Sequence, residues 1–215
     1  LSDPDGAYAL GPWGRRYQQG WGDIDVGVTY RVFDGTGDRA WSRLGSADGR
    51  RWRQSVGATF RVGTGSPVDP DDPLMLPTGD GQHDIELVSA TDLLWGAHAW
   101  GSVVLRYTKQ LSDERVARLP VASLSPYLPL SRRVLAERAP GDRVQLDVAP
   151  RWVFNDYLAV GTRYRFVHEA ATSWREVAPA DGAAALRATG EPMTVHEAAF
   201  GVTWSSIAAW QRGRS

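Results

Sequence analysis

The chain has 215 residues, enough for one all-β domain of ordinary size, and its 24 basic and 25 acidic residues leave a net charge of −1. A nucleic-acid-binding domain is usually clearly basic, so this balance argues against nucleic acid as a partner. The sequence contains no cysteine, which excludes disulfides, thiolate metal sites and thiol nucleophiles. No run of apolar residues approaches the roughly 20 that a membrane-spanning helix needs.

Apolar and polar residues alternate strictly in a series of segments, each about a dozen residues long, as in strands with two unlike faces. In the first segment, Val26, Val28 and Tyr30 lie on one side, while Asp25 and Arg31 lie on the other. The pattern predicts seven strands, in chain order at 22–34, 51–63, 83–94, 97–110, 143–154, 157–168 and 195–207.

Short and long connections alternate from the second predicted strand onward. Residues 94–96 join the third and fourth strands, and Asn155-Asp156 is expected to form a two-residue hairpin, because Asn and Asp tolerate positive φ. The connection at 35–50 breaks this alternation, since it is long where a short turn is expected. A helical turn is expected near 131–138, within one of three long loops, which are predicted at 64–82, 111–142 and 169–194.

Such an arrangement is typical of an antiparallel up-and-down transmembrane β-barrel, with short turns on one side of the membrane and long loops on the other. We therefore expect residues 1–215 to form a single β-barrel domain in the bacterial outer membrane. Seven is an odd number, whereas single-chain bacterial barrels have an even number of strands. The chain is thus expected to be part of a larger barrel, with further strands supplied by a longer parent chain or by other copies. Residues 1–21 have little period and are one place for a lost strand.

Three stretches carry a resemblance to a known family. They are RYQQGWGDIDVGVTYRVFD (16–34), FRVGTGSPVDPDDPLMLPTGDGQHDIELVSA (60–90) and HEAAFGVTWSSIAAWQRGRS (196–215). They resemble the outer-membrane barrels first associated with meta-cleavage pathways of phenol degradation, which are described as transporter-like. The resemblance implies an outer-membrane location and the passage of small hydrophobic molecules, and it supplies no catalytic residues.

The alternation places arginines and carboxylates together on the polar side of the strands, which in a barrel would face inward. Charges enclosed in a lumen need partners or water, and arginine suits bidentate pairing with a carboxylate. These side chains either form a charged constriction that selects solutes or fill a narrow lumen as a structural network, and the sequence leaves both open. The candidate pore-lining residues are Arg31, Arg61, Arg106, Asp147, Arg151, Arg163 and Arg165.

Enzymatic activity, a cofactor and a metal site are not expected. His98 and Ser102 share a face of one predicted strand, but the strand rise separates them by about 13 Å, too far for a nucleophile and its base. The aspartates between 69 and 84 fit turn chemistry better than a calcium loop. Several aromatic residues near strand ends are expected to form an interfacial belt: Trp52, Trp95, Trp100, Trp152, Phe154, Tyr157 and Trp204.

The function expected from these features is a passive route through the outer membrane for small molecules, hydrophobic or aromatic ones among them. Membrane lipid and a small-molecule solute would be the partners. Two alternatives stay open. One is a soluble, secreted β-sandwich that binds carbohydrate through surface aromatics, and the other is a structural envelope barrel with a plugged lumen.

Overall fold

In the computed structural model, the part of the chain that can be described is all-β and antiparallel. It comprises residues 20–35, 50–67, 70, 76–96, 98–120, 131–155, 157–179, 181 and 183–204. These residues form eleven strands in two sheets and contain no helix. The predicted all-β, antiparallel fold is therefore confirmed.

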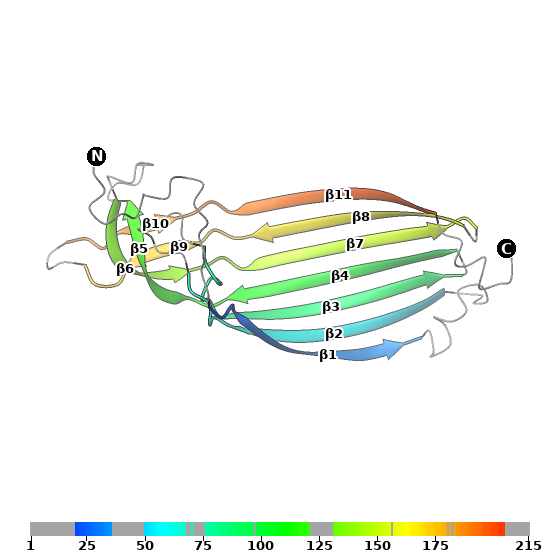
Figure 1. Cartoon of the computed structure of the whole chain (residues 1–215), viewed down its shortest axis with the longest axis horizontal. Coiled ribbons are helices and arrows are strands. Elements are labelled where there is room, and N and C mark those ends of the chain that lie inside the picture. Colours follow the sequence, from blue (N-terminus) through cyan, green and yellow to red (C-terminus); the bar gives the residue numbers. More distant parts are fainter. Residues whose placement is uncertain are drawn as a thin grey trace.

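A seven-stranded sheet contains all seven strands that the sequence predicts. Every neighbouring pair is antiparallel, and the spatial order follows the chain, as in an up-and-down meander. Figure 1 shows these long strands side by side. In order across the sheet they are β1 (Ile24–Asp34), β2 (Arg50–Val62), β3 (Asp84–Trp95), β4 (Ala99–Gln110), β7 (Arg143–Val153), β8 (Leu158–Glu169) and β11 (Met193–Trp204).

Four shorter strands form a second sheet that the sequence analysis missed. The predicted loop at 111–142 contains two of them, and the predicted helical turn near 131–138 is a strand, so both predictions are wrong there. The predicted loop at 169–194 contains the other two. In spatial order the four strands are β5 (Asp113–Pro120), β6 (Ser131–Ala139), β9 (Ser173–Glu176) and β10 (Arg187–Thr189).

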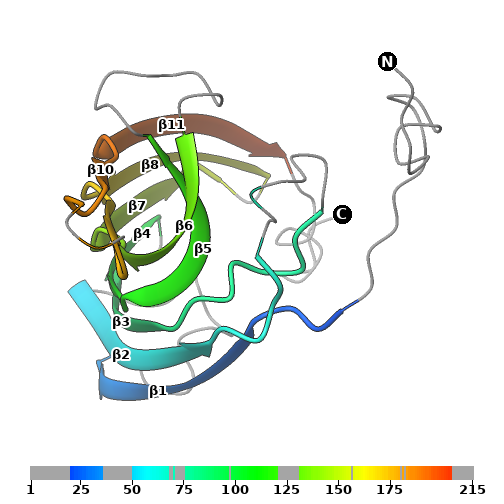
Figure 2. The ribbon, with the colours of Figure 1, turned by 90° about the vertical axis from the view of Figure 1, so that its left-hand side faces the viewer.

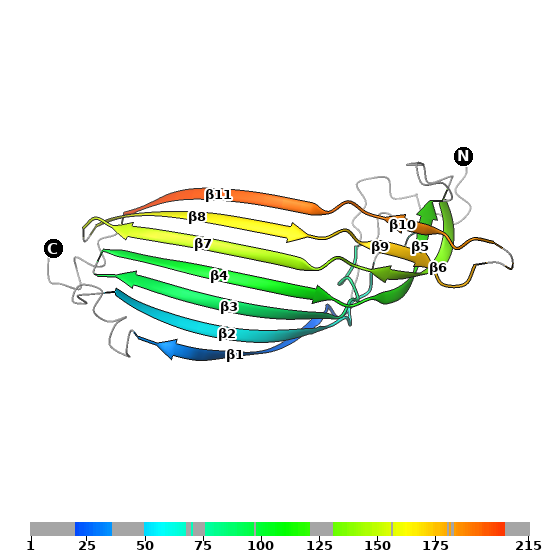
Figure 3. The same ribbon diagram turned by 180° about the vertical axis from the view of Figure 1, so that it is seen from behind.

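The second sheet is an extension of the first. β5 follows β4 after two residues, β6 precedes β7, β9 follows β8, and β10 precedes β11, so the strand order β5-β6-β9-β10 repeats β4-β7-β8-β11. Figure 3 shows this continuation from behind. We use the term fold line for the four short breaks between the sheets, at 111–112, 140–142, 170–172 and 190–192.

Close packing of backbone at the fold line explains the glycine at position 141. The amide of Ala170 donates to the carbonyl of Asp142, with a nitrogen–oxygen distance of 3.0 Å. A Cβ on Gly141 would lie 1.9 Å from the carbonyl oxygen of Ala170, so no larger residue fits without backbone movement. Pro140 and Pro192 also stand in these breaks, and proline cannot donate to a strand ladder.

The seven-stranded sheet is strongly curved and open. Figure 2 shows an arc from β1 to β11, with β5 and β6 crossing one end of it. In the described residues, β1 and β11 pair only with β2 and β8, so the described residues do not close into a barrel. The two-residue turn predicted at Asn155-Asp156 lies partly outside the described residues. β7 ends at Val153 and β8 begins at Leu158, and the Asn155 side chain accepts hydrogen bonds from the amides of Tyr157 and Leu158 at 2.9 Å.

Candidate functional site: the polar inner face

The two faces of the seven-stranded sheet differ completely in chemistry. Polar residues from β1, β2, β3, β4, β7 and β8 line one common pocket, which places them on the concave side of the arc. We call this side the inner face and the opposite side the outer face. The outer face is apolar and uncovered, since Val28 is 70% exposed, Leu87 51% and Leu105 48%.

Several polar groups on the outer face bond to one another. The Gln54 amide nitrogen donates to the Ser89 hydroxyl at 2.8 Å, and the Thr91 hydroxyl donates to the Gln54 carbonyl oxygen. The Tyr164 hydroxyl and Nδ1 of His196 lie 2.8 Å apart. These polar side chains are thus satisfied without water, which lowers the cost of placing them in an apolar medium.

All seven predicted pore-lining residues lie on the inner face, and four of them form one cluster. Asp147 on β7 is 7% exposed and lies 2.6 Å from Arg163 and 3.1 Å from Arg165, both on β8. Arg106 on β4 approaches the same carboxylate at 3.8 Å. Three guanidinium groups therefore surround one carboxylate.

Two further carboxylates limit the excess positive charge of this cluster. Glu86 lies 3.8 Å from Arg106, and Glu197 lies 3.3 Å from Arg165. The cluster therefore contains three arginines and three carboxylates, so its formal charges cancel. Its members are Arg106, Arg163, Arg165, Glu86, Asp147 and Glu197. The sequence correctly placed the arginines on one face, but only the register across strands showed which carboxylate each one meets.

The remaining three predicted residues lie away from this cluster. Arg61 pairs with Asp25 at 2.8 Å and approaches Asp84 at 3.7 Å. Arg31 pairs with Asp34 at 2.9 Å at the edge of the sheet, where a bulge between 31 and 33 brings both residues to the inner face. Arg151 stacks over the ring of Trp100, with 4.9 Å between the guanidinium carbon and the ring centroid.

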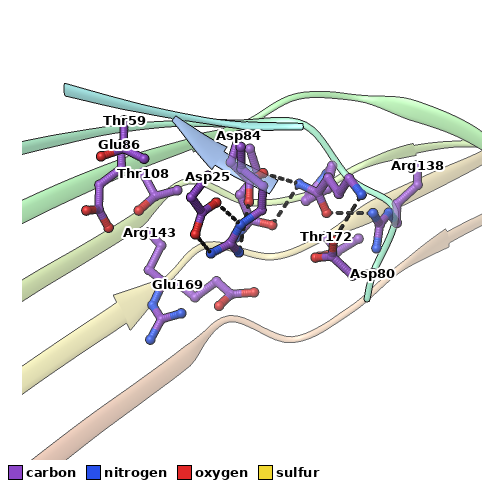
Figure 4. Close-up of a pocket in the computed structure, with 14 residues that line it drawn as sticks. Asp25, Thr59, Asp80, Asp84, Glu86, Thr108, Arg138, Arg143, Glu169 and Thr172 are labelled. Carbon is purple, nitrogen blue, oxygen red and sulfur yellow. Dashed lines mark hydrogen bonds and ion pairs between the residues drawn. The ribbon is translucent and has the colours of Figure 1, made fainter. Parts of the chain in front are cut away.

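A polar pocket of about 380 Å³ lies on the inner face beside the fold line. Figure 4 shows Asp25, Asp84 and Glu169 around it, with Arg138 on the side of the second sheet. Arg143 and Glu169 are cross-strand partners and both line it. Its only apolar lining residue is Pro140, so the pocket suits a small hydrophilic molecule. Among the seven predicted pore-lining residues, Arg61 alone lines this pocket.

A buried amide joins the two sheets at this pocket. Gln82 is 1% exposed and donates to Asp84 at 2.8 Å and to Gln110 at 3.1 Å, while its carbonyl oxygen accepts from Arg138 on β6 at 2.5 Å. Arg138 also donates to Asp113 on β5 at 2.8 Å. The sequence analysis missed this network because it treated 111–142 as a loop. The sequence DERVARLP of β5 does not alternate strictly between apolar and polar residues, so it gave no signal for this strand.

Two of the motifs that carried the family resemblance meet in space. The Asp23 carboxylate accepts hydrogen bonds from the amide of Gly65 at 2.8 Å and from the amide of Asp80, in the Pro-Thr-Gly-Asp-Gly turn, at 3.0 Å. Burial by itself would raise the pKa of Asp23, but these backbone donors outweigh it and hold the pKa below its usual value. Gly81 in this turn has a φ of 65°, which favours glycine.

Most of the aromatic residues predicted for a belt lie at the end of the sheet opposite the fold line. Trp52, Trp95, Trp152 and Trp204 are exposed there on the outer face, and Tyr157 stacks on Trp204 with 5.8 Å between ring centroids. Trp100 differs from the others, because its ring lies on the inner face beneath Arg151. The apolar outer face is therefore bounded by aromatics at one end and by the fold line at the other.

No model of a protein family matches the sequence, and no curated protein matches it as a relative. In the described part of the chain there is no helix long and apolar enough to cross a membrane. Within those residues, no three His, Asp or Glu side chains are grouped so that they could hold a metal ion.

Proposed function

We propose that this protein forms most of the wall of a bacterial outer-membrane β-barrel that provides a passive route for small hydrophilic solutes. The observation that carries the proposal is the opposition of the two sheet faces, with an uncovered apolar outer face and an ion-paired inner face. A membrane barrel needs this arrangement because lipid surrounds it and polar groups fill its interior.

The dimensions of the sheet agree with this proposal. Its seven strands are 11 to 13 residues long, and a tilted strand crosses the hydrocarbon core in about 9–11 residues. The aromatic belt would mark one membrane interface and the fold line the other. A sandwich, by contrast, would bury Val28, Leu87 and Leu105 between two sheets, whereas the second sheet leaves these residues uncovered.

The chemistry of the inner face favours hydrophilic solutes. The family resemblance implies hydrophobic or aromatic cargo, but the pocket beside the fold line is lined almost entirely by charged, amide and hydroxyl side chains. Transfer of an aromatic molecule through such a lining would gain little from burial and would displace water from charged groups. Selection would rest on size and on the field of the fixed charges in a narrow passage.

The alternative of a plugged structural barrel also has a specific observation in its favour. The Asp147 cluster has no net formal charge, and β5 and β6 cross one end of the arc. A lumen filled by paired charges and capped by the second sheet would strengthen the envelope without conducting.

Conductance in planar lipid bilayers separates the two functions. For a passage, we expect measurable conductance in the wild-type protein, and a shift toward cations in the Arg163→Gln/Arg165→Gln variant, because two positive charges leave the inner face while the carboxylates stay. Arg187→Gln in the second sheet is the control and should leave ion preference unchanged. A wild-type protein that inserts but does not conduct would refute the passage and support the plugged barrel.

A further inference from the structure

The two edge strands of the seven-stranded sheet run in the same direction. Six antiparallel pairings lead from β1 to β11, and an even number of reversals restores the starting direction. Any strand that is to be antiparallel to one edge is therefore antiparallel to the other as well.

Both edges lack a neighbour in the described part of the chain, and their side chains reflect it. On the outer face, Val28 and Tyr30 of β1 are each 70% exposed and Phe200 of β11 is 69% exposed, compared with 51% for Leu87 on the central strand β3. An edge strand also presents a row of unpaired amide and carbonyl groups, which hydrocarbon does not tolerate.

Copies of this sheet alone cannot supply the missing neighbours. All copies of an outer-membrane protein insert in the same orientation, so in a ring of copies β11 of one would meet β1 of the next, and the two would be parallel. Direct pairing of β1 with β11 in one molecule is parallel too. An antiparallel β1–β1 pair between two copies would require one copy to be inverted in the membrane. Transmembrane barrels of this class are antiparallel throughout.

We propose that one contiguous run of strands from the same polypeptide, outside residues 24–204, closes the sheet, and that the number of these strands is odd. Its first and last strands run antiparallel to β1 and β11 and complete an even-numbered barrel. The inference rests on the proposed function, since only lipid forces both edges to be paired. The same polypeptide is the source because every pairing already present follows chain order.

The residues at the edges define the chemistry of this segment. On the outer face it must continue the apolar row formed by Val28 and Phe200. On the inner face, the side chain of Glu197 on β11 is mostly exposed, and its contact with Arg165 is long, with 3.3 Å between nitrogen and oxygen. A basic or hydrogen-bond-donating side chain opposite Glu197 would complete its pairing.

Nuclear magnetic resonance of the full-length protein in lipid nanodiscs tests the inference. Antiparallel neighbours give strong contacts between facing Hα protons, and parallel neighbours do not, because their backbones are staggered. We expect antiparallel Hα contacts from both β1 and β11 to residues outside 24–204 of the same molecule. A second sample, refolded from a mixture of isotope-labelled and unlabelled protein, should show no contacts between copies at either edge.

Three results would overturn the inference. They are contacts between β1 and β11 of different copies, a parallel pattern at either edge, and rapid amide exchange along both edges, which would indicate that they are bare. Contacts between lipid acyl chains and the methyl groups of Leu105 report separately on the proposed function. If these lipid contacts are present but the copies pair, only the closure inference fails; if they are absent, the membrane assignment itself fails.

Discussion

The four strands of the second sheet continue four strands of the seven-stranded sheet, yet the outward-facing residues of the two sheets differ sharply. In the seven-stranded sheet that face carries Val28, Leu87 and Leu105. In the second sheet, Val116 and Leu135 are exposed but lie among many charged side chains, which include Glu114, Arg118, Arg133, Glu137 and Arg175. The change occurs at the fold line, within a few residues on each of four strands.

If the protein lies in the outer membrane as proposed, this difference marks the place where its surroundings change. If neighbouring strands stay in the same medium along their whole length, nothing requires their outward-facing residues to change from apolar to charged at the same height. A shared switch from an apolar to a charged surface is what a membrane interface produces, because an exposed charge costs little in water and much in hydrocarbon. The second sheet would then be the part that stands in water.

The largest expected effect comes from placing the same charge on each sheet. Leu105 lies midway along β4, and an arginine there should lower the free energy of unfolding by about 2–4 kcal/mol in lipid vesicles. Val116→Arg on the second sheet is the matched control, since Val116 is 41% exposed, and should change it by less than about 0.5 kcal/mol. Urea titration of both variants makes the measurement. Equal, small effects would place both surfaces in water.

The next effect compares the buried carboxylates of the two sheets. Asp147→Asn should lower the free energy of unfolding by about 1.5–3 kcal/mol, because it weakens the charged hydrogen bonds of Arg163 and Arg165. Glu176→Gln, which disturbs the contact with Arg132 at 2.6 Å, should loosen only the second sheet. Hydrogen exchange should show faster amide exchange across β4, β7 and β8 in the first variant and in β9 alone in the second. Global loosening by both would show that the sheets unfold as one unit.

A smaller effect is expected from the fold line itself. Gly141→Ala puts a Cβ 1.9 Å from the Ala170 carbonyl oxygen, so the backbone must shift, at a cost of about 1–2 kcal/mol. Gly201→Ala is the control, because its Cβ meets no described atom within 4 Å and should be close to neutral. The two free energies of unfolding should therefore differ. If they do not, the backbones at Gly141 and Ala170 are not in close contact at the fold line.

The smallest effect concerns pH and the loop held by Asp23. Its folded pKa is lowered, so the stabilisation is fully present above the usual aspartate pKa of about 4 and is lost as the pH falls below it. Amide exchange at Gly65 and Asp80, corrected for the intrinsic pH dependence of exchange, should accelerate as the pH falls below about 4. Asp23→Asn should abolish this dependence, whereas Asp181→Asn should leave it intact. A pH dependence that persists in Asp23→Asn would assign it to another group.

The alternation in the sequence predicted the seven long strands, their antiparallel order and the placement of every predicted arginine on one face. It did so because a period of two is a local property, which a segment of about a dozen residues shows without help from the rest of the chain. It also placed aromatic residues at the ends of strands. Trp100 differs from the others because it shares its face of β4 with Arg106, and it faces inward beside Arg151.

The second sheet and the pairing of the charges became visible only in the folded structure. β9 and β10 are 4 and 3 residues long, and so short a strand carries almost no periodic signal. The contact of Asp147 with three arginines depends on the register of β4, β7 and β8. The hydrogen bond between Gln82 and Arg138 depends on the bend of the chain at the fold line. Register and bend bring together residues far apart in the chain, and no local pattern of residues encodes such distances.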